Sequence, residues 1–272
     1  MLTNSPSYKK SSFGPAFFFL GKRQREALAH YYEFCRLMDD LADEPDVPNP
    51  AEQLAQWKDE IARMYRGQAQ TELGRLLAQD VQTFSIPQDR FLLLIEGMQA
   101  DLQGRTYQTG AELDWYIYRV AVAVGLATLD ILGLQGPEAD KLALHQGTAV
   151  QLTNIIRDVP DDARLGRVYL PEDLLHRFGL TRADVLENRN PRGVAAALKE
   201  LDARTQAEYA RAFACMAAFP RLKMLPCRVM GYVYLKNLAK IRKTGFLFTR
   251  PIKLTKGEKL NCIFYALLKT VC

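Results

Sequence analysis

The sequence predicts an all-α protein built as one domain over residues 1–272. Apolar residues recur at steps of three and four along most of the chain, as helices with one buried face require. Short alternating runs typical of strands are almost absent. The stretches between the helical segments are short, and no repeat or low-complexity linker divides the chain. These observations favour a single bundle of antiparallel helices around a central cavity.

Each helix is placed by this spacing and by the Pro, Gly, Asp and Asn residues that interrupt it. In chain order, the expected helices span residues 22–43, 51–65, 86–102, 112–133, 138–158, 198–213, 225–243 and 257–270. The expected breaks are residues 44–50, 85–87, 133–137, 160–171 and 188–193. At the fourth break, Pro160 lacks an N–H and restricts Val159. We therefore expect Asp162 to leave the line of the preceding helix.

Composition is that of an ordinary globular protein, with 48% hydrophobic and 25% charged residues. The net charge of +5 favours anionic partners, although a basic-leaning surface accounts for it equally well. One run of basic residues comprises Lys236, Lys240, Arg242, Lys243, Arg250, Lys253 and Lys256. It lacks a recognisable nucleic-acid-binding module, so we expect no nucleic-acid partner.

The five cysteines form no CxxC pair, and no apolar run reaches the roughly 18–20 residues that span a bilayer. The start of the chain lacks the continuous apolar stretch of a secretory signal. These features predict a cytoplasmic protein, with peripheral contact to the inner membrane surface as an alternative. The Phe-rich run at residues 13–20 could dock on a membrane or seal the core of the bundle.

The first chemical motif is an acidic helix end. Asp39 and Asp43 stand one turn apart on the same helix face, with Arg36 beside them. Two carboxylates at that spacing repel, and a divalent cation bridging them would offset the cost. Mg²⁺ commonly takes one or two carboxylates together with substrate phosphate. The alternative is a solvated acidic helix end.

The second motif places Asn154, Asp158 and Asp162 at successive four-residue steps. Apolar neighbours indicate a buried helix, so these polar groups should face a polar cavity or an ion. Alternatively, Asn154 and Asp158 satisfy each other and Arg157. Two such faces, each with an arginine able to bind phosphate through its planar fork, favour a shared diphosphate site.

The stretches CRLMDDLAD and QLTNIIRDVPDDARLGRVYLP resemble the paired aspartate-rich signatures of the squalene/phytoene synthase family. Further similarity covers nearly the whole chain from Ser12 to Tyr234, and includes residues 96–102 and 112–125. The resemblance implies an all-α prenyl-synthase fold and head-to-head joining of two allylic diphosphates. Pro160 departs from the pattern, since relatives typically have Gly there, and this makes Asp162 the least secure ligand.

The resemblance also implies roles for individual residues. Magnesium ligands would be Asp39, Asp43, Asn154, Asp158 and Asp162. Diphosphate or substrate contacts would come from Ser11, Ser12, Tyr32, Arg36, Gln151, Asn154, Arg157 and Tyr234. Catalytic groups would be Arg36, Arg157, Tyr118 and Tyr234, with the tyrosines steadying a cation or relaying its proton. Either tyrosine is alternatively a core residue.

An apolar cavity must exclude water from the carbocation that forms when an allylic diphosphate ionises. Small residues that could let prenyl chains pass between helices are Ala121, Ala123, Gly125 and Gly147. Close helix packing is the alternative explanation for each.

The short length and the text at residues 230–238 and 250–260 most resemble the branch that condenses two farnesyl diphosphates to presqualene diphosphate. That branch uses Mg²⁺ without NADPH and precedes a squalene-forming enzyme in hopanoid-associated squalene synthesis. Alternatives are phytoene synthesis from two geranylgeranyl diphosphates and full squalene or dehydrosqualene synthesis. A catalytically silent helical protein that binds prenyl diphosphates is the non-enzymatic alternative.

Overall fold

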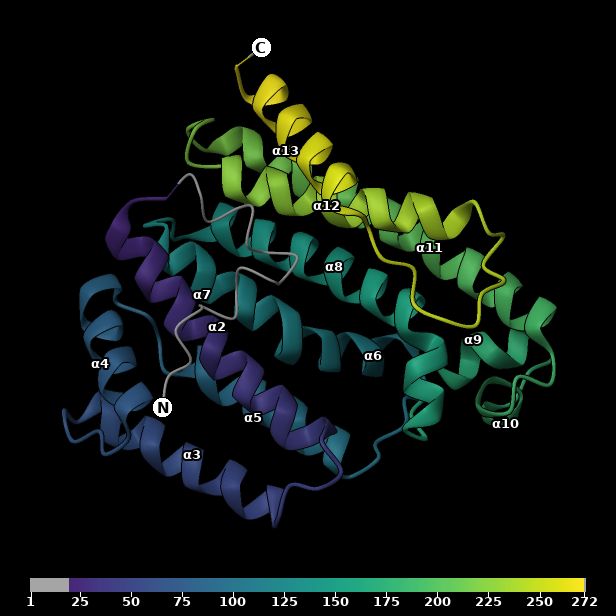
Figure 1. Cartoon of the computed structure of the whole chain (residues 1–272), viewed down its shortest axis with the longest axis horizontal. Coiled ribbons are helices and arrows are strands. Elements are labelled where there is room, and N and C mark those ends of the chain that lie inside the picture. Colours follow the sequence, from purple (N-terminus) through teal and green to yellow (C-terminus); the bar gives the residue numbers. More distant parts are fainter. Residues whose placement is uncertain (1–19, 272) are drawn as a thin grey trace.

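The structure of the protein is a computed structural model, and it describes residues 20–271. Every regular element in that stretch is helical, which confirms the predicted all-α fold. The α-helices are α2 (Lys22–Asp43), α3 (Pro50–Tyr65), α4 (Glu72–Phe84), α5 (Asp89–Leu102), α6 (Gly110–Ile117), α7 (Ala123–Ile131), α8 (Pro137–Arg164), α9 (Glu172–Arg177), α10 (Arg182–Leu186), α11 (Pro191–Cys215), α12 (Leu225–Arg242) and α13 (Lys256–Val271). Figure 1 shows α3 and α4 along one edge, α8 through the middle, and α12 and α13 along the opposite edge.

The long helix α8 is the centre of the bundle and packs against α7, α11 and α12. Leu142, Leu152 and Ile156 are fully or almost fully buried along it. Because neighbours cover most of its surface, the one side that remains open faces an internal cavity, and the polar residues on that side gather there.

Helix α4 was not expected from the sequence. The Thr71 hydroxyl caps its first turn by accepting a hydrogen bond from the Gly74 N–H at 2.9 Å. Leu77 and Val81, one turn apart, bury its inner face. A Thr N-cap before apolar residues at four-residue spacing is a helix-start pattern, so the signal was present in the sequence.

The predicted break at Pro160 is wrong, because α8 continues through this residue to Arg164. Proline removes one backbone donor, which leaves the Ile156 carbonyl without its helical partner. Pro160 lies about one turn from the end of α8, so only this last turn depends on bonds beyond it. Asp162 consequently stays on the helix and lines the same cavity as Asn154.

The end of α8 is closed by a left-handed glycine. Gly166 has φ of +72°, and its N–H donates to the Ala163 carbonyl at 3.0 Å. The Arg167 N–H donates to the Asp162 carbonyl at 2.8 Å. This pair of bonds is a Schellman motif, which stabilises the last turn and fixes the direction in which Arg167 leaves the helix.

The segment predicted as one helix over residues 112–133 contains a π-helical turn, Tyr118–Val122, between α6 and α7. Glycines on two neighbouring helices allow this turn to be approached closely. A Cβ added to Gly97 of α5 would lie 2.3 Å from Val120 Cγ1. One added to Gly147 of α8 would lie 2.9 Å from Val122 Cα. Both distances are too short for a real Cβ. Helices α5 and α8 can therefore approach the π-helical turn this closely because Gly97 and Gly147 have no side chain.

Helix α13 lies on α12 at one edge of the bundle. Its Cys262 Sγ contacts the Tyr232 carbonyl at 3.6 Å, and the Tyr265 ring meets the Tyr232 ring edge-on at 4.9 Å between centroids. No helix within residues 20–271 is long and apolar enough to cross a membrane.

Candidate active site

A cavity of about 510 Å³ lies between α2, α5, the π-helical turn, α7, α8 and α12. Along α2, the residues that line it change from apolar Leu28 to the carboxylates Asp39 and Asp43. Along α8, they change from Ala143 to Asp158 and Asp162 in the same chain direction. One end of the cavity is therefore acidic and the rest is mainly apolar.

The two acidic faces meet at the C-terminal ends of their helices. Asp43 is the last residue of α2, and Asp162 is two residues from the end of α8. The C-terminus of a helix carries a partial negative charge from its unpaired carbonyls. Carboxylates at two such ends repel each other and the helix dipoles, so the arrangement favours a bound cation.

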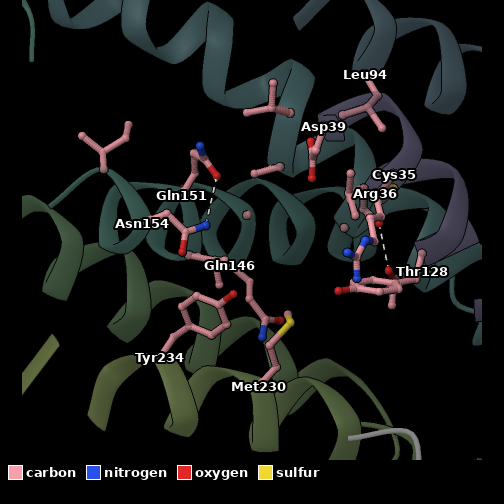
Figure 2. Close-up of a pocket in the computed structure, with 18 of the residues that line it drawn as sticks. Cys35, Arg36, Asp39, Leu94, Thr128, Gln146, Gln151, Asn154, Met230 and Tyr234 are labelled. Atoms are coloured by element: carbon pink, nitrogen blue, oxygen red, sulfur yellow. Dashed lines mark hydrogen bonds between the residues drawn. The ribbon is translucent and has the colours of Figure 1, made fainter. Parts of the chain in front are cut away.

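The pKa of Asp39 reflects both its burial and this repulsion. Burial, together with Asp43, Asp101 and Asp40, raises the pKa of Asp39 to about 7. Arg36 does not compensate, because its Nε lies 3.5 Å from Asp40, on the more exposed side of α2. Figure 2 shows Asp39 and Arg36 at the wall of the cavity formed by α2.

The second face combines a paired and an unpaired polar group. Arg157 holds Asp158 through two hydrogen bonds, Nε to Oδ1 at 2.8 Å and Nη2 to Oδ2 at 2.5 Å. Asn154 donates to Gln151 Oε1 at 3.3 Å, which Figure 2 shows as a dashed line. Asn154 Oδ1 is buried and accepts no hydrogen bond from residues 20–271. A buried acceptor of this kind needs a partner, and a metal ion or a bound water would supply one.

Asp162 carries the largest carboxyl shift of this face. Burial and then the Asp158 charge raise the pKa of Asp162 to about 8, although Arg167 opposes the shift. Its side chain lines the acidic end of the cavity. A carboxyl with a pKa this high carries a proton near neutral pH, and a divalent cation can displace that proton.

Arg167 joins the two acidic faces and was not assigned a role from the sequence. Its guanidinium forms an ion pair with Asp43, and its Nη2 donates to the Ala42 carbonyl at 2.7 Å. Arg167 therefore caps the C-terminus of α2 from the end of α8. In the sequence, only the position of Gly166 and Arg167 directly after an acidic helix indicated a role for Arg167. Its partner Asp43 lies 124 residues away, so the pairing could not be predicted from local spacing.

A second unassigned group is Asp101 at the end of α5. Its two carboxylate oxygens each accept one phenolic hydrogen bond, from Tyr116 and from Tyr169, both at 2.8 Å. The two rings stack with centroids 5.1 Å apart. Burial raises the pKa of Asp101 to about 6. All three residues line the cavity.

Tyr118, which the resemblance assigned a catalytic role, lies outside the cavity wall, and that role stays a prediction. Its side chain is 39% exposed and it is absent from the cavity wall, where Tyr116 is found instead. The π-helical turn begins at Tyr118 and presents Val120 and Ala121 to the cavity. Helical spacing alone does not reveal such a change of phase.

Tyr32 and Tyr234 both line the cavity. Tyr234 is buried on α12, and burial raises the pKa of its phenol, with Arg157 and Asp158 close enough to affect it. Figure 2 shows its ring facing Asn154 across the cavity. The assigned Ser11 and Ser12 lie outside the described residues.

The small residues divide between the two explanations. Ala121, Gly125 and Gly147 line the cavity, whereas Ala123 is fully buried in the core. Gly147 also serves close packing against the π-helical turn. The apolar wall contains one amide, Gln146, whose Nε2 donates to the Cys227 carbonyl at 2.7 Å and ties α8 to α12.

The donor set suits a hard divalent cation bound together with phosphate. Among residues 20–271, no three His, Cys, Asp or Glu side chains are grouped closely enough to hold an ion by themselves. Carboxylates on two helices with a gap between them would suit Mg²⁺ bound together with diphosphate oxygens and water. The unpartnered Asn154 Oδ1 adds a neutral oxygen to this set.

Comparison with known proteins agrees with this geometry. The sequence profile described as squalene/phytoene synthase matches residues 8–258. The chain belongs to the squalene/phytoene synthase family. This membership implies prenyl diphosphate substrates, which fit a cavity with a charged end and an apolar body.

The similarity extends over whole chains. The presqualene diphosphate synthase of Rhodopseudomonas palustris is 40% identical over 95% of this chain and 94% of its own length. That of Sinorhizobium fredii is 35% identical over 96% of each chain. The crystal structure of a dehydrosqualene synthase in complex with ligand superimposes with a TM-score of 0.86 at 27% identity, covering 96% of this chain and 92% of that one.

Proposed function

We propose that this protein joins two farnesyl diphosphates into presqualene diphosphate and releases one diphosphate. The observation that carries the proposal is the meeting of two acidic helix ends over one cavity with a mainly apolar body. Relatives that are presqualene diphosphate synthases, similar over nearly their whole length, support this reaction among those of the family.

Mg²⁺ bound by Asp39, Asp43, Asn154, Asp158 and Asp162 would neutralise the leaving diphosphate. Arg36 and Arg157, which line the cavity beside these groups, would bind phosphate oxygens through their guanidinium forks. When the C1–O bond of one substrate breaks, an allylic cation forms, and the leaving group takes the electron pair. Gln151 and Tyr32 would orient the diphosphates at the acidic end.

The 2,3 double bond of the second substrate then attacks that C1, and loss of a proton from the same carbon closes a cyclopropane. The second diphosphate is retained, so the two substrates yield one C30 diphosphate, one diphosphate and one proton. The apolar wall excludes water from the cation, and the buried Tyr234 ring can stabilise positive charge across its face. No electron donor enters this sequence, so NADPH is not required.

The product retains a diphosphate on the CH₂ group attached to its cyclopropane ring, and it must be consumed by an enzyme that ionises it again. We therefore propose a squalene-forming enzyme as the next partner.

Product analysis tests the proposal directly. The purified protein is incubated with farnesyl or geranylgeranyl diphosphate and Mg²⁺, with and without NADPH, and the products are identified by mass spectrometry. We expect presqualene diphosphate from farnesyl diphosphate, unchanged by NADPH and abolished by EDTA or by Asp39→Ala. Squalene formed with NADPH, phytoene formed from geranylgeranyl diphosphate, or binding without turnover would each contradict the assignment.

A further inference from the structure

Helix α13 has an apolar ridge that nothing in the described part of the chain covers. Leu260, Phe264 and Leu268 follow one another at four-residue steps and are 66%, 61% and 47% exposed. The buried face of the same helix consists of Cys262, Ala266 and Thr270, which pack towards the bundle. At 100° per residue, the ridge lies opposite that buried face, so it points directly away from the protein.

The segment that carries this ridge is basic, and Lys256 stands one turn before Leu260 on the line of the ridge. Residues 250–271 contain five cations, namely Arg250, Lys253, Lys256, Lys259 and Lys269, and one acid, Glu258. Five minus one leaves +4, compared with +5 for the whole chain. The one acid is engaged on the inner side, because Glu258 Oε2 accepts from Lys240 Nζ at 3.0 Å and from the Thr255 N–H at 2.7 Å.

We propose that α13 docks lengthwise on the surface of a bilayer that contains anionic lipid. The ridge of Leu260, Phe264 and Leu268 enters the boundary between headgroups and acyl chains, while Lys256 and the other cations of residues 250–271 contact lipid phosphates. A helix with one apolar face and a basic border is typical of interfacial binding. At 16 residues, α13 is about 24 Å long, shorter than the roughly 30 Å hydrocarbon core, so it lies on the membrane without crossing it.

Charge distinguishes a lipid surface from a second copy of the chain. A symmetric dimer through α13 would bring two segments of net charge +4 together, which like-charge repulsion opposes. An anionic bilayer offers both complements at once, apolar depth for the ridge and phosphates for the lysines. Each Lys or Arg near such a surface contributes about 1 kcal/mol of attraction.

This docking would bring the membrane close to the cavity. Helix α13 packs on α12, and α12 supplies Cys227, Met230 and Tyr234 to the cavity wall. Helices α13 and α12 then lie between the lipid surface and the cavity, which keeps the path of apolar substrates and products short. The docking itself does not depend on which reaction the site performs.

Flotation of the full chain with vesicles tests the proposal. One set contains phosphatidylcholine alone and the other contains phosphatidylcholine mixed with phosphatidylglycerol. We expect binding to the second set, weakening as salt is raised because ionic attraction is screened.

Two variants separate the contributions of the ridge and the cations. Leu260→Ser with Leu268→Ser removes two apolar contacts, and its matched control is Leu144→Ser with Leu165→Ser, two leucines exposed elsewhere. Lys253→Gln with Lys256→Gln and Lys269→Gln removes three cations; the control changes Lys22, Arg192 and Lys199 to Gln. Each test variant should lose about tenfold or more in vesicle affinity, and the controls should lose little.

Each outcome decides the question. Loss of affinity in both test variants, with unchanged thermal melting and unchanged turnover of detergent-solubilised substrate, supports docking through α13. If the variant with Leu260→Ser and Leu268→Ser binds vesicles as tightly as the unaltered protein, docking through α13 is overturned. It is also overturned if vesicle affinity falls as much in the control variants as in the test variants. Light scattering measures the oligomeric state. If the unaltered protein does not bind vesicles but forms a dimer, and Leu260→Ser with Leu268→Ser disrupts that dimer, the ridge is a self-association surface and the proposal is overturned.

Discussion

Arg167, the second residue beyond the end cap of α8, forms an ion pair with Asp43, the last residue of α2. The same guanidinium donates to the carbonyl of Ala42. One side chain thereby holds the C-terminal ends of both acidic helices together. The separation of the two aspartate-rich faces, and hence the space for a diphosphate, depends on this link.

Neutralising Arg167 should weaken this link and the electrostatic balance of the site. Arg167 opposes the rise in the pKa of both Asp101 and Asp162, so Arg167→Gln should raise both pKa values further. We expect the acidic limb of the pH–rate profile to move to higher pH. Because the Asp43 side chain is about half exposed, the loss in unfolding free energy should be only about 1 kcal/mol. Arg167→Lys should restore much of the profile; an unshifted limb in Arg167→Gln would contradict this account.

Asp158 provides a test of the acidic faces with a control three residues away. Asp158→Asn should lower turnover about 100-fold or more, because charge developing on the leaving group loses its counter-ion site. Asp161→Asn removes a carboxylate that pairs with Arg164 outside the cavity wall, and should have little effect. Steady-state release of diphosphate measures both. Similar losses in the two variants would indicate a general charge effect instead of a metal site.

The shifted carboxyl of Asp162 predicts how stability varies with pH. Its pKa rises from 3.8 to about 8 on folding, so between these values the folded chain binds a proton that the unfolded chain has lost. Without metal, stability should therefore fall as pH rises through that window.

Mg²⁺ competes with this proton, so it should bind more tightly at higher pH. We expect Mg²⁺ to raise the melting temperature more at about pH 8 than at about pH 6. In Asp162→Asn, the rise in melting temperature caused by Mg²⁺ should differ less between the two pH values. Equal increments in the unaltered protein, measured by calorimetry, would be inconsistent with proton–metal exchange at this site.

Gly147 should be intolerant of a side chain. A Cβ there would approach the backbone of Val122 to 2.9 Å, and backbone cannot move aside as a flexible side chain can. Gly147→Ala should cost about 1–3 kcal/mol of unfolding free energy. Gly110→Ala is the control, because within residues 20–271 no atom outside its own chain neighbours and helix backbone lies within 4 Å of an added Cβ. Denaturant titration compares the two, and equal stability would show that the π-helical turn yields easily.

The sequence by itself determined the helical class of the fold and the residues that share each acidic face. Those properties are local: four-residue spacing places Asn154, Asp158 and Asp162 on one side of any continuous helix. The family signatures are likewise carried by contiguous text, so the chemistry was predictable before the fold was known.

Only the tertiary structure decided which groups meet across the cavity. Arg167 reaches Asp43, and Asp101 accepts from Tyr169, through contacts between residues far apart in the chain. Tyr118 is exposed whereas Tyr116, two residues earlier, lines the cavity, and the packing of α6 and the π-helical turn against neighbouring helices decides which of the two faces inward. Pro160 stays within α8 because the left-handed turn at Gly166 closes the helix beyond it. Spacing specifies which residues share a face, whereas packing between distant elements specifies what that face touches.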